Sequence, residues 1–223
     1  MKLTDREYCY TIEGVFTPSV VVGFTKPALK GDPAQDIKKA LADLYESFKV
    51  AHLKQIHSAK IHLIKEGGIY EGDGLFTSTC DTVIVVRTAD CLPILLHSRN
   101  LGIAGVIHMG WRSAREGILD NIPYELSSFK ALAGVGLRKC CYAVGKDFLE
   151  YSNLSSFVGK NKDGLYFDPT SFAKNALIRH GLKQENFFDT GICSFCSKGN
   201  FFSFRRDKTI NRTLSFILQL REK

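Results

Sequence analysis

Two histidines and one cysteine stand in three separate short segments of the 223-residue chain. His57 lies in segment 55–58 (Gln-Ile-His-Ser), Cys91 in segment 88–93 (Thr-Ala-Asp-Cys-Leu-Pro) and His108 at the start of segment 108–112 (His-Met-Gly-Trp-Arg). Two imidazoles and a thiolate can hold a zinc ion and leave one tetrahedral position open for water or substrate. The same three residues could instead form a nucleophilic cysteine with a histidine base. Both arrangements predict an enzyme.

The residues beside these three are polar or aromatic. Asp90 precedes Cys91 and is a polar group that a purely apolar core would avoid. Trp111, the only tryptophan, and Arg112 follow His108 where a glycine lets the chain turn. A histidine at the end of a strand beside these two side chains indicates a pocket with an aromatic wall and a fork that binds anions.

The charge balance favours a small anionic ligand over nucleic acid. Thirty basic residues against 23 acidic ones give a net charge of +7. The basic residues are dispersed, and the densest group is the pair Arg205 and Arg206. Dispersed charge predicts a mildly basic solvated surface, with phosphate or anion binding at a local site as the alternative, and no nucleic-acid partner.

The apolar runs and the cysteines indicate a cytoplasmic protein. The longest apolar runs have the length of a strand and are too short to span a bilayer, and residues 1–7 lack the apolar core of a secretory signal. We therefore expect the seven cysteines to be reduced. Cys193 and Cys196 have CxxC spacing, but the second CxxC of a structural zinc site is missing. The sequence therefore favours packing roles for them, and a structural zinc or redox role is the alternative. The adjacent Cys140 and Cys141 are expected to be small strand residues.

Hydrophobic periodicity predicts one α+β domain over residues 1–223, with mixed sheets covered by helices. The pattern predicts strands at 20–25, 52–57, 61–65, 81–87, 93–97, 103–108, 137–144 and 201–204. It predicts helices at 34–50, from about 112, at 172–180 and at 209–220. On a continuous strand, His57 would point away from His52 and His62, because odd separations alternate between faces.

Several segments together resemble the YfiH-like family, whose members are also described as polyphenol oxidase (laccase) domain proteins, purine nucleoside phosphorylases and peptidoglycan-editing factors. The three segments around His57, Cys91 and His108 carry the resemblance. It continues through segments 71–75, 141–145, 167–168, Cys193 and 201–207, and so covers nearly the whole chain. The chain departs from the family pattern at Met109, Ser113 and Ala143.

The resemblance implies a zinc-binding cytosolic enzyme with a layered α-β-β-α sandwich. It implies that His57, Cys91 and His108 are the metal ligands, with zinc favoured over copper. The activities attached to the family are phosphorolysis of adenosine, inosine, guanosine and methylthioadenosine, and deamination of adenosine. A purine nucleoside and phosphate are then the expected partners.

Phosphorolysis requires groups that hold phosphate beside the nucleoside. Arg112 and the pair Arg205 and Arg206 are the best candidates for that anion. Trp111 or Phe202 is a candidate to stack on the base, and Asp73 or Asp90 can orient a zinc ligand or move a proton.

Three other functions stay open. A Cys-His amidase, with Cys91 as nucleophile and His108 as base, would suit editing of muramyl-peptide precursors in peptidoglycan synthesis. A partner-binding protein that kept the fold would have no catalytic activity. Copper laccase chemistry is disfavoured, because reducing oxygen by four electrons needs more copper ligands than six scattered histidines supply. The sequence leaves the oligomeric state open.

Overall fold

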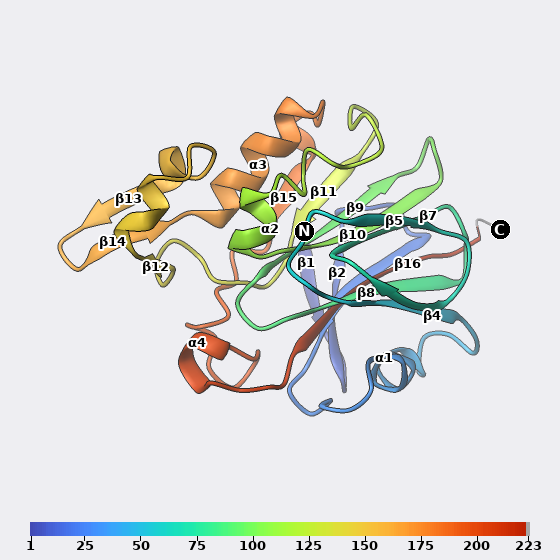
Figure 1. Cartoon of the computed structure of the whole chain (residues 1–223). Coiled ribbons are helices and arrows are strands. Elements are labelled where there is room, and N and C mark those ends of the chain that lie inside the picture. The colour runs from blue at the N-terminus through green and yellow to red at the C-terminus, as the bar shows by residue number, and fades with distance from the viewer. Residues whose placement is uncertain (222–223) are drawn as a thin grey trace.

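The computed structural model describes residues 1–221 and contains two large mixed β-sheets that pack face to face, with a small third sheet at one side (Figure 1). In spatial order, the first sheet contains β1 (Lys2–Asp5), β2 (Cys9–Glu13), β3 (Val20–Thr25), β16 (Thr213–Gln219), β8 (Thr82–Thr88), β4 (Lys49–Lys54) and β6 (Gly68–Glu71). The second contains β15 (Phe187–Asp189), β11 (Lys130–Ala133), β9 (Leu92–Ser98), β10 (Ile103–Met109), β7 (Gly74–Thr77) and β5 (Ile61–Ile64). The small sheet contains β12 (Ala143–Val144), β14 (Gly164–Phe167) and β13 (Val158–Asn161).

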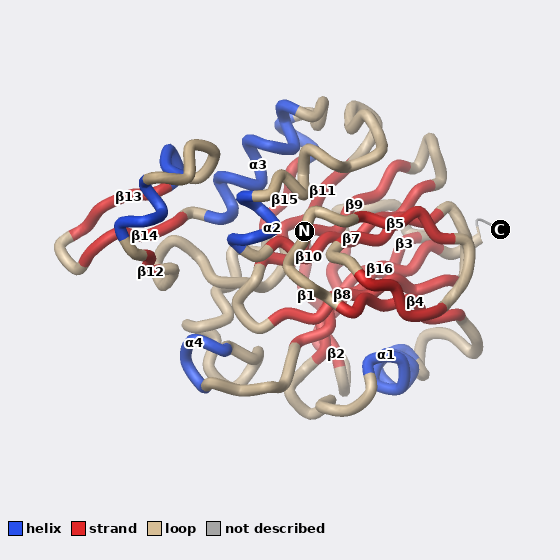
Figure 2. Tube along the Cα trace, in the orientation of Figure 1, coloured by secondary structure: helices blue, strands red, loops and turns tan. Residues whose placement is uncertain are grey.

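The helices are short. The α-helices are α1 (Pro33–Leu41), α2 (Trp111–Arg115), α3 (Pro169–Arg179) and α4 (Phe204–Asp207). Of these, α1 and α3 pack on the outer faces of the first and the second sheet (Figure 2). The 3-10 helices are η1 (Lys146–Leu149), η2 (Ser155–Phe157) and η3 (Gln184–Asn186). No helix within residues 1–221 is long and apolar enough to cross a membrane.

The buried side chains define four layers. Along β8, Val85 shares a buried cluster with Ile37 of α1, whereas Ile84 shares another with Val106 of β10 in the second sheet. On the outer face of the second sheet, Leu96 of β9 belongs to a third cluster with Leu177 of α3. Because successive residues of a strand point to opposite faces, each sheet is covered on both sides. The α+β fold with an α-β-β-α order of layers is therefore confirmed.

The helix predicted at 209–220 is wrong, because this segment forms β16, a strand in the middle of the first sheet. Residues 215–219 pair antiparallel with β3, and residues 213–219 pair antiparallel with β8. Every residue of β16 is buried. An apolar run that is buried on both faces lacks the alternation of a half-exposed strand, so its periodicity cannot separate it from a buried helix.

Other predicted boundaries also differ from the structure. The helix expected at 34–50 ends at Leu41, because Lys49 begins β4, which pairs in parallel with β6 and β8. Of the strand expected at 137–144, only β12 at its end forms, since residues 138–142 make a turn. The segment expected as a strand at 201–204 instead leads into α4, where the Ser203 side chain accepts a hydrogen bond from the backbone N–H of Arg206.

Candidate functional site

The structure brings together the two histidines and the cysteine that the sequence singles out. His57 lies in the turn after β4, Cys91 in the connection between β8 and β9, and His108 near the end of β10. Their possible ligand atoms all lie within 4.8 Å of one another. Nε2 of His57 is 3.9 Å from Sγ of Cys91, and the two imidazole centroids are 4.8 Å apart.

His57 reaches this position by leaving the strand. The prediction of a strand through 52–57 is wrong in its last residues, because β4 ends at Lys54 and His57 has a left-handed φ of 59°. The alternation of faces on a continuous strand therefore does not apply to His57. A side chain other than glycine is held in this conformation only when the surroundings compensate for the strain.

Asp73 supplies that compensation and joins His57 to His108. Its fully buried carboxylate accepts backbone N–H bonds from Ile56 at 3.3 Å, His57 at 3.1 Å and Ser58 at 2.6 Å. The same carboxylate lies 2.7 Å from Nδ1 of His108. A carboxylate that accepts from Nδ1 fixes the imidazole tautomer and leaves Nε2 free to bind a metal.

Asp90 holds the segment that carries Cys91. Its φ is 96°, and its carboxylate accepts hydrogen bonds from the Ser194 hydroxyl at 2.8 Å and the Arg205 backbone N–H at 2.6 Å. Its carbonyl accepts from the backbone N–H of Leu137 at 2.7 Å. Asp90 thus connects the Cys91 segment to distant parts of the chain.

Electrostatics favour an ionised thiol opposite a protonated imidazole. Burial opposes ionisation of Cys91, but the charge and hydrogen bonds of His108 and then His57 outweigh burial and lower the pKa of Cys91 to about 6. Burial likewise opposes protonation of His108, but Cys91 and Asp73 outweigh it and raise the pKa of His108 to about 9. The thiolate is the form of cysteine that binds metals and attacks electrophiles.

The chemistry and spacing of the donor atoms fit a zinc ion. A tetrahedral ion with ordinary zinc–nitrogen and zinc–sulfur bonds would hold these two atoms about 3.6 Å apart, close to the 3.9 Å between His57 and Cys91. A Cβ on Gly110 would come within 3.0 Å of His57 Cδ2 and 3.1 Å of Cys91 Sγ. Glycine at this position therefore leaves the space that the two side chains occupy.

The three side chains line a cleft of about 740 Å³. This volume is in the range of small-molecule sites. The cleft is also lined by cationic side chains, namely Arg87, Arg112, Arg205, Lys208 and Arg212. Its aromatic lining consists of Trp111, Tyr142, Phe148 and Phe204. The cleft suits a ligand with both a flat ring and a negative charge.

Trp111 and Arg112 both line the cleft, as the sequence predicts for a pocket beside His108. The Trp111 indole stacks on Tyr151 with an interplanar angle of 16°, and the Arg112 guanidinium lies 4.6 Å from the indole centroid. Tyr151 and Arg112 both lie against the Trp111 ring. Trp111 can therefore hold the Arg112 guanidinium at the edge of the cleft through a cation–π contact.

The two consecutive arginines have different surroundings. Arg205 lines the cleft, and its guanidinium donates to the carbonyls of Cys141 at 3.2 Å and Ala143 at 2.7 Å. Arg206 is not among the residues that line the cleft. Its guanidinium donates to three backbone carbonyls and pairs with Asp207 at 2.7 Å. The geometry gives Arg206 a structural position rather than a place at the cleft.

Sequence reasoning missed Arg87, which lines the cleft from the end of β8. The amide of Gln55 accepts from the Arg87 backbone N–H and donates to its carbonyl, each at 2.8 Å. The buried Nε of Arg87 has no hydrogen-bond partner among the described residues. An arginine at the end of an apolar strand is the only signal in the sequence, and the unpaired donor becomes visible only in the folded chain.

Several known proteins are similar to this chain in sequence or in fold. A family model described as multi-copper polyphenol oxidoreductase laccase matches residues 21–219. A purine nucleoside phosphorylase of Borreliella burgdorferi is 35% identical over 178 residues, covering 72% of this chain and 75% of its own. A purine nucleoside phosphorylase of Aquifex aeolicus is 36% identical over 175 residues, covering 74% and 81%.

A solved structure shares the fold along nearly its whole length. The crystal structure of the hypothetical protein YfiH of Bacillus licheniformis superposes with a TM-score of 0.86 at 20% identity, covering 98% of this chain and 99% of that one. At this level of identity the match establishes the fold alone. The family-model match and the phosphorylase relatives establish the kinship, and the chain belongs to the YfiH-like, multi-copper polyphenol oxidoreductase laccase family.

Proposed function

We propose that this protein is a zinc-dependent purine nucleoside phosphorylase whose metal ligands are His57, Cys91 and His108. One observation carries the proposal: the donor set of two imidazoles and a thiolate opens into a cleft with a cationic and aromatic lining. The names of the two relatives supply the substrate class, a purine nucleoside with phosphate.

The reaction needs a positioned phosphate. A phosphate oxygen forms a bond to C1′ of the ribose, the bond from C1′ to the purine nitrogen breaks, and the base leaves with that electron pair and takes up a proton. Arg112 and Arg205 line the cleft and can face the phosphate, and Arg87 lines the cleft as well. A guanidinium offers several N–H donors in a planar fork, which suits the oxygens of a phosphate.

The base needs a flat apolar surface. Phe204 lines the cleft and is 49% exposed, so its ring offers a free face. Lys208 lies over the same ring at 5.4 Å from its centroid. We assign stacking of the purine to Phe204, and we assign to Trp111 the placement of Arg112.

The residues around the metal ligands orient them for zinc. Asp73 accepts a hydrogen bond from Nδ1–H of His108, which turns Nε2 toward the site, and the lowered pKa of Cys91 supplies the thiolate. Because the pKa of His108 is raised, zinc binding would have to displace the proton on Nε2. When bound, zinc polarises a substrate oxygen or lowers the pKa of a water molecule. The latter chemistry also serves deamination of adenosine, which we propose as a second reaction at the same site.

The pairing of Cys91 with His108 favours one alternative, a thiol-dependent amidase acting on muramyl-peptide precursors. A cysteine pKa near 6 beside a protonated imidazole is the arrangement of an activated nucleophile. In this alternative Cys91 attacks an amide carbonyl and His108 gives a proton to the leaving amine. No metal is required for that reaction.

The geometry gives little support to laccase chemistry. Among the other histidines, His62 bonds to the carbonyl of Glu71, His97 to Gln219 and His180 to the carbonyl of Ile122. These side chains therefore lie in separate hydrogen-bonded settings rather than beside the His57 cluster. Coupled multi-copper chemistry requires several ligand sets close together.

Activity with inosine separates the two enzyme hypotheses. The purified protein is assayed for release of hypoxanthine with and without phosphate, before and after removal of metal by a chelator. A phosphorylase releases the base only with phosphate, loses activity after verified metal removal, and recovers when zinc is restored. A thiol amidase keeps its amide hydrolysis after the same treatment and does not cleave inosine.

A further inference from the structure

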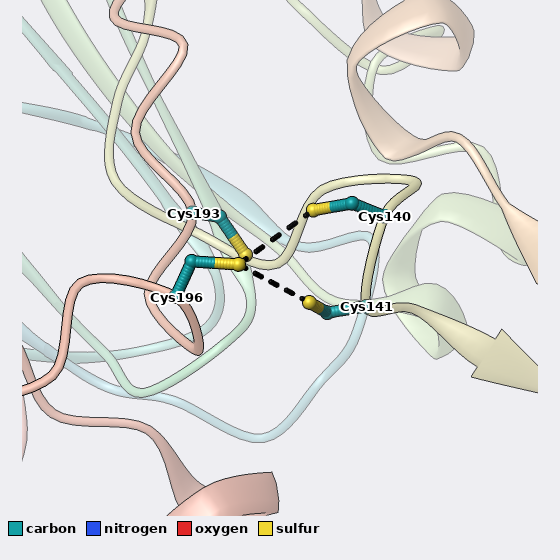
Figure 3. A group of neighbouring side chains, drawn as sticks. All are labelled: Cys140, Cys141, Cys193 and Cys196. Atoms are coloured by element: carbon teal, nitrogen blue, oxygen red, sulfur yellow. Dashed lines mark hydrogen bonds between the residues drawn. The ribbon is translucent and has the colours of Figure 1, made fainter.

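A second cluster of metal-binding side chains lies outside the proposed active site. Its members are Cys140, Cys141, Cys193 and Cys196, and their four sulfur atoms all lie within 4.8 Å of one another. The sulfur of Cys196 is 3.4 Å from that of Cys141 and 3.9 Å from that of Cys140 (Figure 3). Figure 3 shows the four side chains converging from two segments that are far apart in the sequence.

Two tight turns present the four sulfurs. In the first, the backbone N–H of Cys141 donates to the carbonyl of Arg138 at 2.9 Å. In the second, the N–H of Ser197 donates to the carbonyl of Cys193 at 3.0 Å. A bridge between Gly136 and Cys193 holds the two turns side by side. The backbone therefore fixes the cysteines independently of any ligand.

We propose that these four cysteines form a structural zinc site. A tetrahedral zinc ion with four sulfur ligands holds the sulfurs about 3.8 Å apart, and the two distances to Cys196 bracket that value. A disulfide requires two sulfurs about 2.0 Å apart, and all seven cysteines are free thiols. On binding, four thiols lose their protons to solvent and form four zinc–sulfur bonds, which gives the centre a charge of −2.

Two arginines brace the turns that carry the cysteines. The guanidinium of Arg206 donates to the carbonyls of Ser194 and Phe195 inside the second turn, at 2.8 and 2.9 Å. The buried guanidinium of Arg138, two residues before Cys140, pairs with Asp189 at 2.8 Å and donates to the hydroxyl of Thr190 at 3.1 Å.

The sequence favours packing roles for these cysteines, and this assignment takes up the alternative of a structural zinc site. No second CxxC is present, but the other two ligands are an adjacent pair more than fifty positions earlier in the chain. Only folding shows that the adjacent pair faces Cys193 and Cys196. Cys140 and Cys196 are also exposed, so they are open to the metal and are poor candidates for core residues.

A metal at this place would brace one wall of the cleft. Tyr142 and Ala143, which line the cleft, directly follow Cys141, and Arg205 binds the carbonyls of Cys141 and Ala143. The Ser194 hydroxyl, between the other two ligands, donates to Asp90 beside Cys91. Zinc at the four cysteines would therefore fix the segments that hold both Arg205 and the Cys91 loop.

Zinc content per chain tests the proposal without any activity assay. The protein is purified under reducing conditions and loaded with excess Zn²⁺, and zinc is measured after removal of the unbound ion. With both sites filled we expect about two zinc ions per chain for the native protein, and about one each for a C91A/H108A variant and a C140S/C196S variant. Cys80→Ser is the matched control, because Cys80 lies outside both clusters, and it should keep the native content.

X-ray absorption at the zinc edge identifies the ligands without removing any of the four cysteines. In C91A/H108A the remaining zinc should have only sulfur neighbours. In the native protein the two sites together should give more sulfur than nitrogen neighbours per zinc. This measurement needs no variant, so it tests the proposal even if a variant does not fold. Nitrogen or oxygen neighbours in C91A/H108A, iron at the site, a disulfide among the four cysteines, or native zinc content in C140S/C196S would overturn the proposal.

Discussion

The carboxylate of Asp73 and Nδ1 of His108 lie 2.7 Å apart, and both side chains are excluded from solvent. The same carboxylate binds the backbone of the His57 turn. Burial opposes its ionisation, but the bonds from His108 and Ser58 outweigh burial and lower the pKa of Asp73. One anionic side chain thus fixes two of the three proposed metal ligands.

Asp73→Asn should weaken zinc binding at the active site. An asparagine side chain has the size of the aspartate but lacks its charge and one acceptor, so that His108 and the His57 turn are held less firmly. We expect affinity for zinc to fall by about 10–100-fold and activity to fall with it at limiting zinc. Competition with a chromogenic chelator measures the affinity. Glu71→Gln makes the same change on an exposed strand and should leave the affinity unchanged.

Replacing Arg87 with alanine should raise the KM for phosphate. A hydrogen bond to a charged group contributes about 1.5–3 kcal/mol, so the loss should be about tenfold to a hundredfold. The KM for inosine should change far less, because the Arg87 guanidinium is assigned to the anion. Steady-state kinetics with each substrate varied in turn measure both values.

Arg206→Ala is the informative comparison for Arg87. The guanidinium of Arg206 binds three carbonyls outside the cleft. The thermal stability of Arg206→Ala should therefore fall, while its KM for phosphate stays near that of the native protein. A larger rise in phosphate KM for Arg206→Ala than for Arg87→Ala would show that the anion site has been placed on the wrong arginine.

Gly110→Ala should disturb the active-site zinc with little effect on the rest of the fold. The new methyl group would approach His57 and Cys91 to 3.0 and 3.1 Å, so one of these side chains must move. Zinc affinity should therefore fall. Gly31→Ala, where the nearest atom is a carboxylate oxygen of Asp36 at 3.3 Å, is the control. Native zinc affinity in Gly110→Ala would contradict the proposed ligand geometry.

The metal-free protein should show an unusually acidic thiol at Cys91. An acid with a lowered pKa is ionised above that value, so alkylation of Cys91 should rise through pH 6 and level off at higher pH. The alkylation rate of an ordinary cysteine would rise near pH 8.5. Burial raises the pKa of Cys9 to about 11, so its peptide should stay unmodified in the same experiment. Peptide mass spectrometry gives both rates.

Removing His108 tests the cause of that acidity. In His108→Gln the alkylation curve of Cys91 should move to higher pH, because the imidazolium that stabilises the thiolate is gone. Zinc should protect Cys91 from alkylation in the native protein at every pH where the metal stays bound. An unchanged curve in His108→Gln would contradict the pairing of the two residues.

Much of the sheet framework can be predicted from the sequence. The strands near 82–88, 92–98 and 103–109 are predictable because each is an apolar or β-branched run bounded by turn residues. Segment 209–220 is mistaken for a helix because burial on both faces of β16 removes the alternation. The parallel pairing of β4 with β8 is a contact between distant segments that no local pattern encodes.

The candidate site likewise has a part that the sequence predicts and a part that depends on the folded chain. His57, Cys91 and His108 can be selected because their residue types and neighbouring motifs suggest metal binding. The unpaired Nε of Arg87 and the joining of Cys140 and Cys141 with Cys193 and Cys196 cannot be predicted, since both depend on which loops meet in space.

Product analysis tests the central claim most directly. Protein stripped of metal and then reloaded with zinc is incubated with inosine and phosphate, and the sugar product is followed by phosphorus NMR. We predict ribose 1-phosphate in equal amount to hypoxanthine, formed by the zinc-loaded protein and absent from the stripped one. Hypoxanthine with free ribose, or full activity in protein verified to lack metal, would contradict a zinc-dependent phosphorylase.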